Sequence, residues 1–158
     1  MNKRKKNTFN FEQLAEAFRK EIEEYGALLI LIYEQQNCLA EHNPISLLKA
    51  TSKIEAQLPA NQLATADRTA FMLQLAELHG CEEIQLNELQ NFVPDEVKSL
   101  FKALVDEVVT LRSRIKSKTQ VQQKLLGQAQ MINSSVLQQV FPGKNGHQAM
   151  LSKIREIL

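Results

Sequence analysis

The sequence predicts an all-α protein, an antiparallel bundle of long helices with one very long helix toward the C-terminus. Glycine and proline together account for only nine of the 158 residues, whereas an all-β domain needs a turn signal every ~8–12 residues. Leucine and glutamine, both good helix formers, occur 22 and 16 times. Apolar residues also recur at spacings of three, four and seven, which is the period of one helix face.

The length fits one domain, so we expect residues 1–9 to form a basic disordered arm and residues 10–158 a single helical domain. The first helix is predicted from about residue 10 to residue 42. Within it, residues 27–33 are apolar on every side and are expected to be buried by more than one neighbour. Gly26 is expected to permit close approach of a neighbouring helix.

Two further helices are predicted before residue 81. Asn43 and Pro44 are typical of a helix start, since Asn caps the first turn and Pro fits the first helical position. Pro59 is expected to end this second helix. A third helix then starts near Thr65 or Asp67 and ends at Gly80, a residue type that favours the position after a helix.

The last third of the chain predicts one long helix. After a short helix expected within residues 81–93, Pro94 is typical of a helix start. The apolar stripe then stays in phase as far as Phe141, over about 47 residues, before a Pro-Gly pair breaks it. A final short helix is expected at residues 147–158.

The net charge of +1 hides an uneven distribution. Residues 1–6 carry four positive charges, residues 7–107 carry seven basic and 17 acidic side chains, and residues 108–158 carry eight basic and one acidic. Such asymmetry indicates that the two halves of the chain face different partners or each other.

Motifs of the common enzyme classes are missing. The sequence holds no glycine-rich phosphate loop, no nucleophile elbow of the form GxSxG, and no pair of histidines in an HExxH frame. We therefore expect no catalytic residues and no enzymatic activity.

One set of side chains could hold a metal. Cys38 and His42 lie four positions apart on the first helix, and His79 and Cys81 flank Gly80 at the end of the third. Three helices running up, down and up would bring both pairs to one end, and two Cys with two His suit tetrahedral zinc. However, helical Cys is usually a small buried hydrophobe, and His near a helix C-terminus interacts well with the helix dipole. We expect no metal and no cofactor.

Nucleic acid and membrane partners are also not expected. Basic residues alternate along the long helix, but no aromatic residue lies between Lys102 and Val140 to stack on bases. The longest apolar run has seven residues, Ala27–Tyr33, whereas a membrane span needs ~20. No apolar segment follows the basic N-terminus, so no secretion signal is predicted and a cytoplasmic location is expected.

The stripe of the long helix changes character along its length. It is apolar as far as Ile115, after which Lys118, Gln122 and Asn133 occupy positions in phase with it. Polar residues here either set the register with a partner helix or lie at the edge of the bundle. Both interpretations predict a half-covered amphipathic surface over residues 119–141, suited to binding another helix. The candidate contact residues are Leu125, Leu126, Ala129, Ile132, Val136, Leu137 and Val140.

The order of these features resembles the FlgN family of flagellar type III export chaperones over about residues 10–141. The family pattern has a long first helix, a Leu-rich second helix, a segment with an Arg and paired leucines, a connector with Pro and one long final helix. Here the Arg segment is similar to residues 68–75, the connector to residues 92–94, and the long helix to residues 100–140. Within that helix, residues 122–126 and 132–137 are similar to the family's Leu pair and the segment that follows it.

The resemblance implies a function in flagellar assembly. Chaperones of this family bind the C-terminal segments of hook–filament junction (hook-associated) proteins in the cytoplasm, keep them unassembled, and deliver them to the flagellar export apparatus. Client binding lies on the long C-terminal helix in the family, and no cofactor is implied. The alternative from the residues alone is a coiled-coil structural or tethering protein, a homo-oligomer formed through the same stripe of the long helix.

Overall fold

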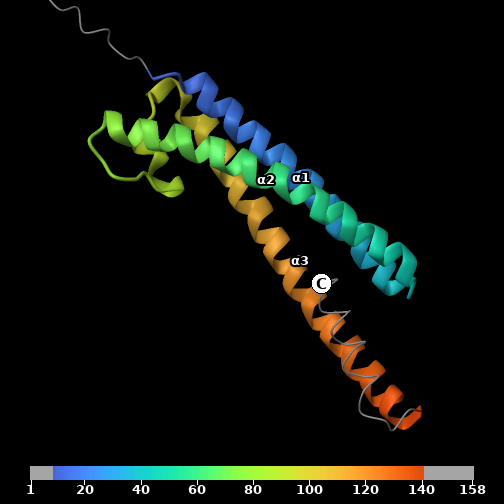
Figure 1. The fold of residues 1–158 in the computed structure, drawn as a ribbon. Helices are drawn as coiled ribbons and strands as arrows, with labels where there is room; N and C mark the ends of the chain where they lie inside the picture. Colours follow the sequence, from blue (N-terminus) through green and yellow to red (C-terminus); the bar gives the residue numbers. More distant parts are fainter. Residues whose placement is uncertain (1–8, 141–158) are drawn as a thin grey trace, which may run out of the picture. The chain divides into compact units, whose positions relative to one another are not determined.

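The computed structural model describes residues 9–140 and shows five helical elements (Figure 1). Three are long α-helices: α1 (Phe11–Ala40), α2 (Pro44–Leu78) and α3 (Lys98–Val140). Two short 3-10 helices lie between α2 and α3: η1 (Leu86–Asn91) and η2 (Asp95–Val97). Residues 9–140 contain no strand, and the predicted all-α bundle of long helices is confirmed.

Some predicted features lie outside the described residues. Residues 1–8 of the predicted arm and the predicted helix at residues 147–158 both fall there. Within α3, the backbone is described to Val140, but the side chains of Leu126 and of residues 129–140 are not.

The turn between α1 and α2 is closed by backbone hydrogen bonds at its centre. The Asn43 N–H donates to the Cys38 carbonyl and the His42 N–H donates to the Leu39 carbonyl, both at 3.2 Å. These two hydrogen bonds form a Schellman motif, in which His42 lies in the left-handed region at φ 51°. Asn43 also begins the next helix, because its Oδ1 accepts from the Ser46 N–H at 3.1 Å. The predicted start of α2 is confirmed.

Pro59 does not end α2, and this prediction is wrong. The residues predicted as a second and a third helix form one helix of 35 residues with Pro59 inside it. A proline in a helix lacks the N–H that would bind the carbonyl four residues earlier. That carbonyl belongs to Glu55, and both Glu55 and Pro59 are exposed, so water can take the place of the lost donor. The next five residues include two alanines and no glycine, so their helix propensity favours continuation of the helix.

The C-terminus of α2 and the start of α3 follow the predictions more closely. Gly80 lies at φ 72°, the Cys81 N–H donates to the Ala76 carbonyl at 2.9 Å, and the Gly80 N–H donates to the Glu77 carbonyl at 3.1 Å. This is a second Schellman motif, and it confirms Gly80 as the stop. The short helix expected within residues 81–93 is η1. The helical segment after Pro94 opens with η2 and continues as α3 without a break to Val140.

The chain divides into two compact units, each of which contains a segment of all three long helices. Unit 1 comprises Met1–Ala27 and Gln57–Arg112, and unit 2 comprises Leu28–Ala56 and Ser113–Leu158. Side-chain contacts show that α1 and α2 run antiparallel in each. In unit 1, Tyr25 meets Thr65 and Glu21 meets Arg68, whereas in unit 2 Glu34 meets Lys53 and Gln35 meets Thr51.

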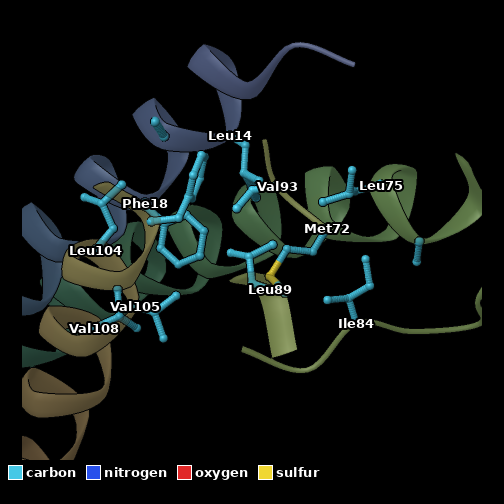
Figure 2. Close-up of a cluster of buried hydrophobic side chains, with 13 residues drawn as sticks. Leu14, Phe18, Met72, Leu75, Ile84, Leu89, Val93, Leu104, Val105 and Val108 are labelled. Carbon is cyan, nitrogen blue, oxygen red and sulfur yellow. The ribbon is translucent and has the colours of Figure 1, made fainter. Parts of the chain in front are cut away.

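Unit 1 holds the main apolar core. Leucine and phenylalanine side chains from α1 face Met72 and Leu75 of α2, and the connector between α2 and α3 closes the remaining side (Figure 2). The rings of Phe18 and Phe101 meet edge to face with centroids 6.1 Å apart. Full burial of each large apolar side chain contributes roughly 1.5–3 kcal/mol. The connector residues in this core are Ile84, Leu89 and Val93, and the α3 residues are Phe101, Leu104, Val105 and Val108.

A buried ion pair crosses unit 1 beside this core. Glu21 of α1 is 1% exposed and Arg68 of α2 is 7% exposed. The Arg68 Nε–H donates to Glu21 Oε2 at 2.8 Å and its Nη2 donates to Oε1 at 3.2 Å. Thr65 adds a third donor to Oε1 at 2.9 Å, so the carboxylate is well satisfied. The guanidinium carbon lies 5.7 Å from the centre of the Phe18 ring.

Among the described residues, the interior of unit 2 is smaller, and the prediction that residues 27–33 are buried on every side is wrong in part. Leu28, Leu29 and Ile32 are buried, but Ile30 is 62% exposed and Tyr33 is 42% exposed. The apolar run is therefore buried on one face only, because α1 packs on that face and leaves the other to solvent. The expected close approach at Gly26 is also wrong, since a Cβ added there would meet no atom within 4 Å.

Candidate functional site

The polar position predicted at residue 122 is a buried hydrogen-bonding residue of unit 2. Gln122 is 5% exposed, and its Nε2 donates to Gln35 Oε1 at 2.8 Å and to the Ile32 carbonyl at 3.3 Å. Gln35 in turn donates to Thr51 Oγ1 at 2.7 Å, so the three helices are joined by one set of side chains. Buried polar groups with satisfied hydrogen bonds fix one helix register over its neighbours. Gln122, which sets the register here, is hydrogen-bonded to α1 of the same chain.

Lys118 lies one turn earlier and also faces α1. Its ammonium group lies 5.0 Å from the centre of the Tyr33 ring, a cation–π distance. The Gln36 side chain donates to the Lys118 carbonyl at 3.4 Å. The side chain of Asn133, the third polar position in the predicted stripe, lies outside the described residues.

Two apolar side chains of α3 on either side of Gln122 face solvent. Leu125 is 47% exposed, and Val121, which the sequence analysis missed, is also 47% exposed. These two residues are four apart and share one side of the helix. We call this pair the Val121–Leu125 face. A signal for Val121 was present, because it lies one turn before Leu125, but it falls outside the stripe that leads from Ile115 to Gln122.

The other six candidate contact residues are helical in backbone, and their side chains lie outside the described part of the chain. They belong to the last 15 residues of α3. Their contacts with α1, α2 or any partner therefore stay a prediction. They are Leu126, Ala129, Ile132, Val136, Leu137 and Val140.

Helix lengths within unit 2 explain why α3 offers a surface. The segment of α3 in this unit has 28 residues (113–140), whereas α1 and α2 contribute 13 each (28–40 and 44–56). At 1.5 Å per residue, each shorter segment covers ~20 Å of a helix that is ~42 Å long. Among residues 9–140, α1 and α2 therefore cannot cover the whole of α3 in unit 2.

The charge around this face is positive. Arg114, Lys116 and Lys124 are exposed on α3, and no acidic residue occurs between Val108 and Arg155. Lys124 directly precedes Leu125. A partner with acidic side chains around an apolar stripe would complement this part of the helix.

The Cys and His pairs that could have formed a zinc site flank opposite ends of one helix. His42 lies in the turn before α2 and His79 directly follows α2, because α2 is a single helix of 35 residues. The arrangement needed to bring both pairs to one end rests on a break at Pro59, and α2 has none. In the described residues, no group of three or more His, Cys, Asp or Glu side chains is placed to hold a metal ion.

A helix that crosses a membrane needs a certain length and apolar character. None of the helices formed by residues 9–140 is both long enough and apolar enough to cross a membrane.

Comparison of the chain with models of protein families, with curated proteins and with solved structures finds no match.

Proposed function

We propose that this protein is a cytoplasmic export chaperone that binds the C-terminal segments of flagellar hook–filament junction proteins and delivers them to the flagellar type III export apparatus. The proposal rests on the resemblance to the FlgN family together with the exposed face of α3. The activity is binding, so it requires neither a cofactor nor catalytic residues.

The observation that supports the proposal most strongly is the exposure of Val121 and Leu125 on either side of a buried Gln122, whose Nε2 donates two hydrogen bonds to α1. Gln122 holds α3 in register with α1, so Val121 and Leu125 are presented on a helix of fixed position within unit 2. An amphipathic client helix can lay its apolar face on such a surface.

Binding of this kind would keep a client unassembled by covering the surface through which it associates. Exposed apolar stripes of amphipathic segments drive self-association, and a chaperone that buries the stripe removes that driving force. The basic residues beside the Val121–Leu125 face would speed the encounter with acidic client segments, and added salt would weaken this attraction.

Isothermal titration calorimetry of the full chain with the C-terminal segment of a junction protein from the same organism tests the proposal. We expect saturable binding with a negative heat-capacity change, because apolar surface is buried. An absence of binding at high protein concentration would refute the chaperone function.

Sedimentation velocity of the chain alone, over a range of concentrations, tests the tethering alternative. A stable oligomer that Leu125→Asp converts to a folded monomer would favour a coiled-coil structural protein that associates through the same face.

A further inference from the structure

Unit 1 contains a cavity that the proposed function does not use. It has a volume of about 400 Å³ and lies between the C-terminal half of α2, the segment 82–86 and the end of the unit's α3 segment. Ligand pockets in proteins commonly span about 300–1,000 Å³. Its apolar wall includes Met72, Ile84 and Leu86. The cavity is therefore large enough to receive one apolar side chain of a partner together with the backbone beside it.

A buried polar group lines this cavity. Arg68 is 93% buried, and Glu21 binds its Nε and Nη2 atoms. Among the described residues, its Nη1 donates a hydrogen bond only to the sulfur of Met72, at 3.4 Å. A thioether is a weak acceptor, and Nη1 carries two hydrogens. Arg68 thus has donor capacity left for an oxygen acceptor, which the backbone carbonyl of a bound peptide would supply.

The segment opposite α2 leaves further hydrogen-bonding groups unused, and its last residue, Gln85, is extended at φ −72° and ψ 150°. Residues 83–85 adopt no helix or strand. Within the part of the chain that the structure describes, the N–H groups of these three residues form no backbone hydrogen bond. A segment with such N–H groups can pair with the main chain of a peptide.

The charge of unit 1 and of the cavity lining indicates which kind of peptide would fit the cavity. Residues 9–27 and 57–112 of unit 1 carry 14 acidic and six basic side chains, a net charge of −8. Glu82 and Glu83 line the cavity, are exposed, and form no ion pair with other described residues. The positive charge of Arg68 is balanced by Glu21, which leaves Arg112 as the one other basic residue in the lining.

We propose that this cavity is a docking site for a basic protein segment, in which one apolar side chain enters between Met72, Ile84 and Leu86 and a flanking Lys or Arg pairs with Glu82 and Glu83. A backbone carbonyl of that segment accepts from Arg68 Nη1. The site lies in unit 1, whereas the Val121–Leu125 face lies in unit 2, so the two sites can be tested independently.

Fluorescence anisotropy with labelled peptides tests this site on the full-length chain. The probe is an acetylated and amidated 12-residue peptide with one Leu flanked by two Lys in an Ala-Gln background. Two control peptides replace Leu by Ser or both Lys by Glu. We expect the probe to bind and each control to bind about tenfold more weakly or not at all, because one removes the apolar anchor and the other the charge pairing.

Four protein variants separate local contacts from the general field of the acidic unit. Glu82→Lys with Glu83→Lys should weaken binding by about tenfold. Glu77→Lys with Glu88→Lys changes the net charge equally, at exposed positions outside the cavity lining, and should weaken it by less than about threefold. Thr69→Trp should abolish binding by filling the cavity. Arg112→Glu should strengthen it by about threefold.

Three results would overturn the proposal. If the Glu-substituted peptide binds best, and if Arg112→Glu weakens binding while Glu82→Lys with Glu83→Lys strengthens it, the partner is acidic. Equal binding by the Glu82–Glu83 and Glu77–Glu88 variants would reduce the effect to general charge attraction. Conversion of a dimer to a monomer by Thr69→Trp in sedimentation equilibrium would make a second copy of the chain the occupant.

Discussion

Glu21 and Arg68, 47 positions apart in the sequence, meet through two hydrogen bonds of 2.8 and 3.2 Å with almost no exposure to solvent. Their contact joins α1 to α2 beside the core of unit 1, and it places the guanidinium over the Phe18 ring. The buried carboxylate and guanidinium are stable only as a pair, because either one alone would lack its counter-charge.

Removal of one partner of this pair should therefore cost more than removal of both. Glu21→Met or Arg68→Met alone should lower the free energy of unfolding by about 3–5 kcal/mol, since each leaves an uncompensated buried charge. The double variant should be more stable than either single variant. Urea unfolding followed by circular dichroism measures all three. Additive losses in the double variant would show that the two residues act independently.

Gly26→Ala should stabilise the protein. The glycine lies inside α1, and a Cβ at this position meets no atom within 4 Å, so the substitution adds helix propensity without a clash. The expected gain in the free energy of unfolding is about 1 kcal/mol. Thermal unfolding should show a raised midpoint. A lowered midpoint would mean that a neighbouring segment approaches Gly26 more closely than the structure indicates.

His42→Gly should also stabilise the protein, for a different reason. His42 lies at φ 51°, where a residue with a Cβ carries a cost of roughly 1–2 kcal/mol that glycine avoids. Part of this gain is lost to the greater freedom of glycine in the unfolded chain, so the expected net gain is about 1 kcal/mol. Gly80→Ala is the matched control at φ 72° and should destabilise. Changes of the same sign in both variants would contradict this account.

Glu24 should contribute to acid sensitivity. An ion pair with Lys20 at 2.7 Å, and then a hydrogen bond from Gln57 at 2.6 Å, hold the pKa of its carboxyl below the usual value of about 4.5. A lowered folded-state pKa stabilises the fold above the unfolded value, and this stabilisation is lost as the pH falls through the folded pKa.

The difference in stability between wild type and Glu24→Gln should therefore shrink below about pH 4.5. Denaturant unfolding at pH 6.5 and at pH 3.5 measures it. A difference that stays constant between these pH values would show that the Glu24 carboxylate is not linked to folding.

Helix ends were the features best predicted from sequence. Asn43, Pro44 and Gly80 act through local backbone chemistry, and the structure confirms each of them. The prediction that Pro59 ends a helix is wrong for a reason that the sequence alone does not contain. Whether a proline ends a helix depends on whether packing on both sides of it offsets the lost hydrogen bond and the clash of its ring, and the burial of Ala50 and Ala64 is decided by tertiary packing.

Buried polar residues were the features least accessible to sequence analysis. Glu21 reads as one more acidic residue on a solvated face, because its burial depends on Arg68, which lies on another helix. The sequence predicts Gln122 as a polar interruption of the stripe, but it does not predict the partner, Gln35. For the candidate site, the sequence located the α3 segment and Leu125, whereas Val121 emerged only from its exposure. Client binding by Leu125 and by the six other candidate residues stays a prediction.

The affinity of a junction-protein C-terminal segment for matched α3 variants tests the central claim most directly. Leu125→Asp places a charge within the Val121–Leu125 face, whereas Val109→Asp places one at a similarly exposed position of α3 in unit 1. A charge within an apolar contact should cost about 2 kcal/mol of binding free energy, roughly thirtyfold in Kd. We predict that Leu125→Asp loses this affinity with helicity unchanged, and that Val109→Asp stays within about twofold of wild type. Equal affinity for Leu125→Asp and wild type would contradict the proposal that this face of α3 binds the client.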